Sequence, residues 1–192
     1  MATHVVQKVS LMTLKRCFPP VVDANTRILI LGSLPGEASL AHGQYYANRQ
    51  NKFWSLVGNV IEQDLVGMDY PARLDGLLKH HIGLWDVVAQ ALRVGSLDSN
   101  IREHASNDLL ELVGSLPNLA AIAFNGGTAA KLGIRALGQD VGKISVDNVA
   151  FQQSGSYVGL CAKAQRVAGL AQLVTSEISA GLASNTRRSI HK

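Results

Sequence analysis

The 192-residue sequence has few cysteines, few aromatic residues and no long apolar run. Its two cysteines, Cys17 and Cys161, offer neither the spacing of metal ligands nor a disulfide framework, which favours free thiols in a reducing compartment. No apolar run approaches the roughly 20 residues that a membrane span requires. The first residues also lack the apolar core and cleavage site of a secretion signal. We therefore expect a cytoplasmic protein that does not bind membranes.

What is present is the composition of one globular domain. Hydrophobic residues make up 47% of the chain and charged residues 17%, and the length is sufficient to bury a sizeable core. The formal net charge of +4 at pH 7 suits an anionic partner, but many proteins that never bind nucleic acid are as basic. The six histidines are scattered without ligand spacing, so the sequence predicts no metal site.

Apolar runs typical of buried strands alternate with helical spacings along the chain. Such alternation predicts a parallel sheet with helices on both faces, a three-layer α/β/α sandwich. The expected strands are residues 28–31, 82–88 and 119–124, and the expected helices are residues 51–65, 71–80 and 107–116, with another helix after the turn at 125–128.

The most unusual stretch is residues 27–54. It begins as a buried strand and continues into a turn at residues 32–36, where two glycines surround a proline. Ligands bind at the carboxyl ends of strands in open α/β sheets, and glycine lets the backbone come close to them, although a plain strand-to-helix turn looks the same. Tyr45 and Tyr46 are adjacent in a polar loop and cannot both face one core. At least one of them is therefore expected to be a stacking platform.

Three polar features have both a structural and a functional interpretation. Asn51 precedes an aromatic pair at the start of the helix at 51–65, where it could simply be the N-cap. Asp86 lies in an apolar strand, which is costly unless the carboxylate forms a salt bridge, caps a turn or lies at the rim of a site. Residues 93–102 form a polar loop with two arginines, which suits phosphate contacts, bracing of the site or plain solvation.

Three blocks between residues 27 and 130 carry a family resemblance. The first block comprises Gly32-Ser33-Leu34-Pro35-Gly36, Ser39, Gln44-Tyr45-Tyr46-Ala47 and Asn51-Lys52-Phe53-Trp54. The second comprises Gly83-Leu84-Trp85-Asp86-Val87-Val88, Arg93, Gly95-Ser96-Leu97-Asp98-Ser99, Ile101 and Asn107-Asp108, and the third is Phe124-Asn125-Gly126 with Ala129. In this order the blocks resemble the motifs of the hypoxanthine-DNA glycosylases, which belong to the uracil-DNA glycosylase superfamily.

The resemblance implies a repair enzyme that hydrolyses the N-glycosidic bond of a deaminated base flipped out of double-stranded DNA. The base would be hypoxanthine, and the sequence does not separate it from uracil or xanthine. Tyr46 would stack on the flipped base. The Asp86 and Asn125 side chains would read its edge, together with the backbone of residues 32–36. Ser39 and Arg93 would contact the DNA backbone.

Asn51 would position the attacking water. In mismatch-specific relatives a water-orienting Asn occupies the position that Leu34 holds here, and leucine cannot take that role. By resemblance we also expect a central, mostly parallel sheet of four strands, a monomer, no cofactor and no lyase step. One departure lies between the tyrosines and Asn51, where the family usually has His-Pro-Arg and this chain has Asn48-Arg49-Gln50.

The resemblance stops before residue 149. The family ends with a motif similar to Leu-Pro-Ser-Ser-Ser-Pro-Ala, then Lys and, four residues later, Trp, whereas residues 149–155 read Val-Ala-Phe-Gln-Gln-Ser-Gly. Codons read one nucleotide further on can encode that motif at 149–155, lysine at 163, tryptophan at 167 and a stop at 174. We hypothesise that the chain beyond a point between residues 133 and 148 is the product of a shifted reading frame.

The chain thus divides into an amino-terminal arm (1–22), a uracil-DNA glycosylase-like domain (23–148) and an atypical tail (149–192). Loss of the last motif leaves an alternative, a catalytically impaired protein that still binds lesions. A small-molecule α/β enzyme is a further alternative, but a phosphate site has no need of paired tyrosines.

Overall fold

The computed structural model describes residues 12–138 and 145–147. Its strands are β1 (Thr13–Arg16), β2 (Ile28–Gly32), β3 (Ile82–Asp86), β4 (Val88–Arg93), β5 (Arg102–Ser106), β6 (Ala121–Phe124) and β7 (Ser145–Asp147). Its helices are α1 (Glu37–His42), α2 (Phe53–Val60), α3 (Tyr70–Lys79), α4 (Leu109–Ser115) and α5 (Gly127–Leu137), with a short 3-10 helix, η1 (Asp98–Asn100).

One sheet consists of parallel strands in the order β3-β2-β6-β7. All five residues of β2 are buried, as expected of an inner strand covered on both faces. The sheet and its helices confirm the predicted α/β class, and the run predicted as a strand at 28–31 is β2.

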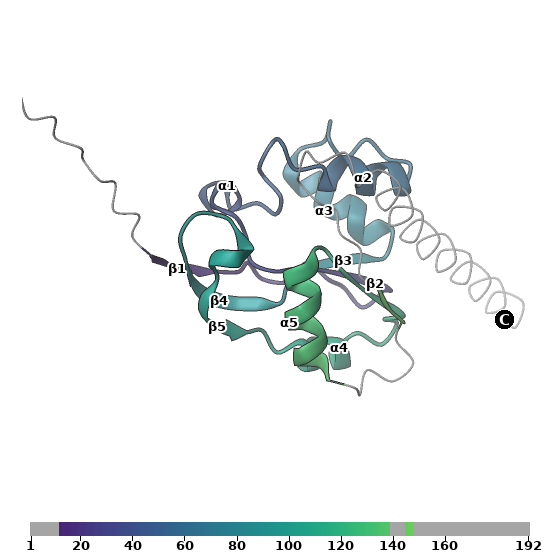
Figure 1. The fold of residues 1–192 in the computed structure, drawn as a ribbon. Helices are drawn as coiled ribbons and strands as arrows, with labels where there is room; N and C mark the ends of the chain where they lie inside the picture. The colour runs from purple at the N-terminus through teal and green to yellow at the C-terminus, as the bar shows by residue number, and fades with distance from the viewer. Residues whose placement is uncertain (1–11, 139–144, 148–192) are drawn as a thin grey trace, which may run out of the picture.

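Helices lie on both faces of this sheet (Figure 1). α2 and α3 pack on one face around Ile28 and Ile30 of β2, whereas α4 and α5 pack on the other around Leu29 and Leu31. Successive side chains of a strand point to opposite faces, so a continuous apolar run supplies both cores. The helix predicted at 51–65 corresponds to α2, with shorter bounds, and the helix predicted at 71–80 corresponds to α3, which begins and ends one residue earlier.

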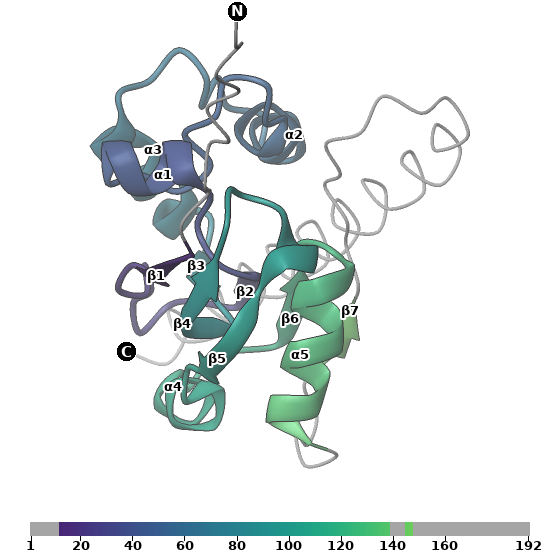
Figure 2. The same ribbon diagram turned by 60° about the vertical axis from the view of Figure 1, so that its left-hand side comes forward.

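A second sheet, antiparallel and in the order β1-β4-β5, was not predicted (Figure 2). The strand predicted at 82–88 is confirmed as β3 for residues 82–86, but its last two residues do not belong to it, because the chain leaves the parallel sheet at Val87 and begins β4 at Val88. The amides of Val87 and Val88 donate to the carbonyls of Gly32 and Ser33, at 2.8 and 3.0 Å, which holds the bend against the end of β2. β4 then runs to Arg93, into the segment predicted as a loop.

The proposed tail at 149–192 lies outside the described residues, as do residues 1–11, so the three sequence divisions remain predictions. Within the described ranges, every helix is too short or too polar to cross a bilayer.

Candidate active site

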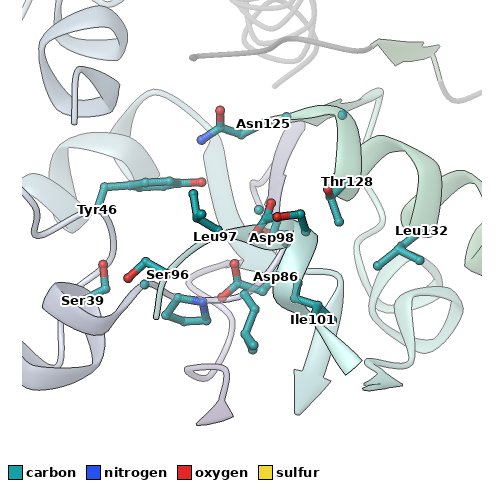
Figure 3. Close-up of a pocket in the computed structure, with 18 of the residues that line it drawn as sticks. Ser39, Tyr46, Asp86, Ser96, Leu97, Asp98, Ile101, Asn125, Thr128 and Leu132 are labelled. Carbon is teal, nitrogen blue, oxygen red and sulfur yellow. Dashed lines mark hydrogen bonds between the residues drawn. The ribbon is translucent and has the colours of Figure 1, made fainter. Parts of the chain in front are cut away.

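The carboxyl ends of β2, β3 and β6 meet at one edge of the parallel sheet. Gly32 of β2 pairs with Asp86 of β3, and Leu31 pairs with Phe124, the residue before Asn125. This edge opens into a cavity of about 780 Å³, and Figure 3 draws 18 of the residues that line it. Open α/β sheets bind ligands at this position. Every residue that the sequence assigned to base binding or to water positioning lines the cavity.

The turn at residues 32–36 depends on a close approach at Gly32. A Cβ atom on Gly32 would lie 2.5 Å from Oδ1 of Asp86 and 3.1 Å from the hydroxyl oxygen of Tyr46. Glycine is therefore needed for the carboxyl group and the phenol to reach this end of β2. The Leu34 side chain is 6% exposed and packs in a small apolar cluster.

The two adjacent tyrosines have different environments. Tyr45 is 3% exposed and packs edge to face against Phe18 in the core. Tyr46 has a φ of 53°, in the left-handed region that tyrosine rarely adopts, and its ring stacks on Phe53 with centroids 3.9 Å apart. Because the two rings are stacked, fully buried Phe53 covers one face of the Tyr46 ring. Tyr46 also lines the cavity. The expectation that the two tyrosines cannot both face one core is wrong, because Tyr46 packs against the same apolar core as Tyr45 and both residues line the cavity. The role of Tyr46 as a stacking platform for a base remains a prediction.

Asp86 ends β3 with its carboxyl group in the cavity wall. The residue is 3% exposed, and Oδ2 has no hydrogen-bond partner among the described residues. Burial, and next the charge of Asp98, raise the pKa of Asp86 to about 7, against smaller opposing effects of Tyr45 and Arg93. A carboxyl group that is partly protonated at pH 7 can both donate and accept hydrogen bonds. In the part of the chain that the structure describes, Asp86 forms no salt bridge.

Asn125 follows β6 at the same edge, and its backbone amide donates to the carbonyl of Leu31 at 2.8 Å. Figure 3 shows its side chain next to the hydroxyl end of Tyr46, with which it interacts. An aromatic face, a carboxyl group and a carboxamide therefore border one cavity. This set of groups suits a flat, polar-edged ligand such as a nucleobase.

Asn51 lines the cavity directly before α2. Its Oδ1 accepts a 2.9 Å hydrogen bond from the backbone amide of Phe53, but the N-cap of α2 is Lys52 and not Asn51, as one interpretation of the sequence had it. A carboxamide oxygen has a second lone pair, so this contact does not prevent Asn51 from binding water. Ser39 is 6% exposed and its hydroxyl accepts from the amide of Ala47 at 3.3 Å, which ties α1 to the tyrosine loop. Its contact with DNA remains a prediction.

The predicted contact of Arg93 with a DNA phosphate is wrong. Arg93 is fully buried, and its guanidinium donates to the carbonyls of Leu34, at 3.2 Å, and Pro35. It also lies 3.7 Å from Oδ1 of Asp98, which accepts a 2.7 Å hydrogen bond from the hydroxyl of Ser33. Arg93 therefore braces the glycine turn from inside the protein, which is the second role that the sequence left open for this segment.

Two residues that line the cavity, Ser96 and Asp98, were not among the site residues assigned from the sequence. Asp98 lines the cavity, and burial raises its pKa while hydrogen bonding from Ser33 opposes that rise. The hydroxyl of Ser96 accepts a 2.8 Å hydrogen bond from the amide of Glu37. Both residues lie in the second block of resemblance, but a short polar segment alone does not distinguish a brace from a solvated loop.

Two features bear on cofactors and covalent chemistry. Across residues 12–138 and 145–147, no three His, Cys, Asp or Glu side chains are placed to hold a metal ion. One lysine, Lys131 of α5, is exposed and lines the cavity in the described part of the chain.

The fold and the site define an α/β protein with a cavity at the carboxyl edge of its parallel sheet. The family model of the uracil DNA glycosylase superfamily matches residues 19–188, and the chain belongs to that superfamily. A protein of Methanosarcina barkeri named hypoxanthine DNA glycosylase is 46% identical over 112 residues, which are 58% of this chain and 71% of the relative. A protein of the same name from Methanosarcina acetivorans is 47% identical over 118 residues, 62% of this chain and 75% of the relative.

A solved structure is also similar. The solution NMR structure of a candidate uracil DNA glycosylase from Methanosarcina acetivorans superimposes with a TM-score of 0.70 at 36% sequence identity. The match covers 86% of this chain and 99% of that structure. These comparisons confirm the resemblance that the three sequence blocks indicated.

Proposed function

We propose that this protein is a monofunctional DNA glycosylase that removes a deaminated base, hypoxanthine above all, from double-stranded DNA. The observation that carries the proposal is the position of Tyr46. One face of its ring lies on buried Phe53, and the ring lines a cavity that also contains Asp86 and Asn125. A base rotated out of the duplex can stack on the ring while its edge meets the two polar side chains. The superfamily and the names of the relatives support the same class of reaction.

Base recognition follows from the hydrogen-bonding groups at the cavity. Hypoxanthine presents an N–H donor at N1 and acceptors at O6 and N7. Asp86 in its protonated form offers one donor and one acceptor, and the carboxamide of Asn125 offers both kinds of group. Backbone amides of residues 32–36 are further donors, except at Pro35, which has no N–H group. These groups complement a purine that carries an oxo group at C6.

The reaction is hydrolysis at the deoxyribose anomeric carbon. The C1′–N9 bond breaks through an oxocarbenium-like transition state, and the bonding electron pair leaves with the base. Water supplies the hydroxyl that bonds to C1′, and the proton that it loses neutralises the departing base. Asn51 orients this water through its carboxamide. Asparagine does not titrate, so its role is to position the water and not to remove the proton.

We extend this proposal to the architecture, the oligomeric state and the cellular location of the whole protein. The four parallel strands form the central sheet of the family's three-layer sandwich, and the helices on its two faces form the outer layers. The protein acts as a monomer without a cofactor, in the cytosol and associated with the nucleoid. Its formal net charge of +4 supports association with DNA.

The test is base release from labelled duplexes that carry one deoxyinosine or one deoxyuridine. Three proteins are compared: the full chain, its Asn51→Ala variant and a chain with the reading frame restored beyond residue 148. Asn59→Ala is the matched control, because Asn59 is an exposed residue of α2, the helix that Asn51 precedes, and does not line the cavity. We expect hypoxanthine release that Asn51→Ala lowers by about 100-fold, on the scale of a lost positioning group, and that Asn59→Ala leaves unchanged.

The same experiment separates two rival outcomes. Preference for deoxyinosine DNA without base release from either the full or the restored chain would favour the lesion-binding alternative, which the missing final motif motivates. Borohydride trapping reports any covalent adduct with Lys131. A trapped complex would contradict the monofunctional reaction.

A further inference from the structure

Lys15 of β1 is a buried lysine that does not line the cavity. Its side chain is 6% exposed, although lysine is rarely buried unless a partner satisfies its charge. The family model begins at residue 19 and the three blocks of resemblance begin at residue 27, so Lys15 lies before both. The burial of this lysine therefore needs an explanation from the structure.

Two acceptors satisfy the ammonium of Lys15. It donates a 2.6 Å hydrogen bond to the carbonyl of Gly95 and a 2.8 Å hydrogen bond to Oε1 of Glu37, the first residue of α1. The hydrogen bond and the charge of Lys15 lower the pKa of Glu37, so this carboxylate is ionised at neutral pH. Lys15 therefore joins three segments: β1, the start of α1 and the connection between β4 and β5.

A further hydrogen bond links α1 to the same connection. The backbone amide of Glu37 donates to the hydroxyl of Ser96 at 2.8 Å, and Ser96 directly follows Gly95. Glu37 thus contacts Lys15 through its side chain and Ser96 through its backbone. These hydrogen bonds form a closed ring that fixes the beginning of the 95–98 segment.

The 95–98 segment forms part of the cavity wall. Ser96, Leu97 and Asp98 all line the cavity (Figure 3). Asp98 accepts a 2.7 Å hydrogen bond from the hydroxyl of Ser33, which lies in the glycine turn. A displacement of the segment would therefore move Asp98 and disturb the turn whose backbone amides are proposed to meet the base.

We propose that Lys15 is a positioning residue of the active site, whose ammonium fixes the 95–98 segment and thereby sets the positions of Asp98 and Ser33 at the cavity. Lys15 acts through the carbonyl of Gly95 and the side chain of Glu37. A misplacement of about 1 Å caused by a mutation far from the chemistry can lower a rate about 100-fold. This inference rests on the proposed glycosylase function and extends the site to a strand that precedes the region matched by the family model.

The experiment measures the single-turnover rate of hypoxanthine release and the Kd for deoxyinosine duplex DNA, with the full chain. Lys15→Met keeps a long apolar side chain and removes the ammonium. We expect the rate to fall by about 10- to 100-fold, while the Kd changes by less than about threefold because Lys15 does not line the cavity. Rates are measured well below the unfolding temperature of each variant, so that a loss of stability alone does not lower them.

Arg16→Met is the matched control. Arg16 is the next residue of β1 and is exposed, so the loss of its charge should leave the rate unchanged. A rate for Lys15→Met within about threefold of wild type would overturn the proposal. A loss of binding that accounts for the whole loss of activity would overturn it as well.

Ser96→Ala removes the other hydrogen bond that holds the segment. If Lys15 and Ser96 act by fixing the same segment, each single variant is slower than wild type. The double variant is then no more than about threefold slower than the slower single variant. Two losses that multiply in the double variant would show that the residues act independently, and would contradict the proposal.

A second readout does not require catalysis. The amide of Glu37 donates to the hydroxyl of Ser96, and the amide of Asn100 donates to the carbonyl of Leu97 at 3.0 Å. Hydrogen exchange at these two amides, followed by NMR, therefore reports how firmly the segment is held. Lys15→Met should speed their exchange by about tenfold, on the scale of one lost hydrogen bond.

The amide of Glu111 is the control for exchange, because it donates to the side chain of Asp108 at the start of α4. If the wild-type protein releases no base, the glycosylase assignment fails, but faster exchange confined to the segment still supports the role of Lys15. Unchanged exchange in the segment, or equal acceleration at Glu111, would overturn that role. If Lys15→Met does not fold, Glu37→Ala replaces it, because that change removes one acceptor of Lys15 at an exposed side chain and should speed exchange in the segment in the same way.

Discussion

The ring of Tyr46 lies on the ring of Phe53, with planes inclined by 20° and centroids 3.9 Å apart. This contact fixes the orientation of an aromatic surface beside the sheet edge, since Phe53 is anchored in the core at the first turn of α2. The left-handed backbone at Tyr46 is the local feature that permits it.

Replacing Tyr46 by Ala should weaken lesion binding. Stacking of a base on an aromatic side chain contributes about 1–3 kcal/mol, so the dissociation constant for deoxyinosine DNA should rise by about 5- to 150-fold. Tyr46→Phe retains the ring and should stay close to wild type. Fluorescence anisotropy with lesion and undamaged duplexes measures the effect. Equal losses for the two variants would assign the effect to the hydroxyl and contradict a stacking role.

Gly32 should not tolerate even one methyl group. In Gly32→Ala the new Cβ meets Oδ1 of Asp86 at 2.5 Å, so either the carboxyl group or the end of β2 must move. We expect a stability loss of about 1–3 kcal/mol in urea unfolding and a loss of base release of about 100-fold.

Gly114→Ala is the control for the Gly32 substitution. Gly114 lies in α4, and an added Cβ there has no neighbour within 4 Å. That variant should be more stable by about 0.5–1 kcal/mol because alanine favours the helix, and its activity should not change. Similar behaviour of the two variants would show that the close approach at Gly32 is not needed.

The chemistry of the site could be read from the sequence because it lies on short segments that follow apolar runs. Gly32, Asp86 and Asn125 each end or follow a strand of the parallel sheet, and parallel strands bring such residues to one edge. The adjacency of Tyr45 and Tyr46 did not separate their environments, because both pack against the same core and both line the cavity.

The second sheet could not be read in the same way. The bend at Val87 interrupts an apolar run without a glycine or proline to mark it, so residues 82–88 resemble one strand. β5 is exposed at all five positions and therefore has no alternating apolar pattern. Long-range pairing with β4, and not local propensity, defines this strand.

Arg93 was misassigned for a related reason. Its acceptors are carbonyl groups 58 and 59 residues away in sequence, so no local pattern shows that its charge is satisfied inside the protein. From sequence alone, an arginine that binds phosphate and an arginine that braces a buried turn cannot be distinguished.

Arg93→Met should therefore destabilise the protein more than it weakens DNA binding. The substitution removes donors from the carbonyls of Leu34 and Pro35 and leaves Asp98 without its buried cation, at a cost of about 3–5 kcal/mol in urea unfolding. Arg102→Met is the control, because Arg102 is exposed and its loss should cost less than about 0.5 kcal/mol.

The salt dependence of DNA binding separates the two possible roles of Arg93. A brace leaves the slope of log K against log salt unchanged, whereas loss of a phosphate contact reduces it by about one. A reduced slope with unchanged stability would return Arg93 to the DNA interface.

Asp86 should make stability depend on pH between about 4 and 7. Its pKa in the folded protein, about 7, lies above the ordinary value of 3.8, so the folded state binds the proton more tightly than the unfolded chain does. Stability attributable to Asp86 therefore falls as pH rises through this window. Asp86→Asn should exceed wild type in free energy of unfolding by about 1–3 kcal/mol at pH 8 and by less at pH 5. Asp75→Asn, an exposed change on α3, is the control.

The rate of base release should also depend on the ionisation of Asp86, so it should vary with pH in the wild-type protein but not in Asp86→Asn. As pH rises above about 7, Asp86 loses the proton that it donates to an acceptor of the purine, and wild-type activity should fall. Asp86→Asn keeps a donor at every pH, so its activity should be lower in the neutral range but flat from pH 6 to 9. Single-turnover rates on single-stranded deoxyinosine measure this without the duplex-opening step. Wild-type activity that rises with pH would mean that the ionised carboxylate is the functional form, and the hydrogen-bonding assignment of Asp86 would be wrong.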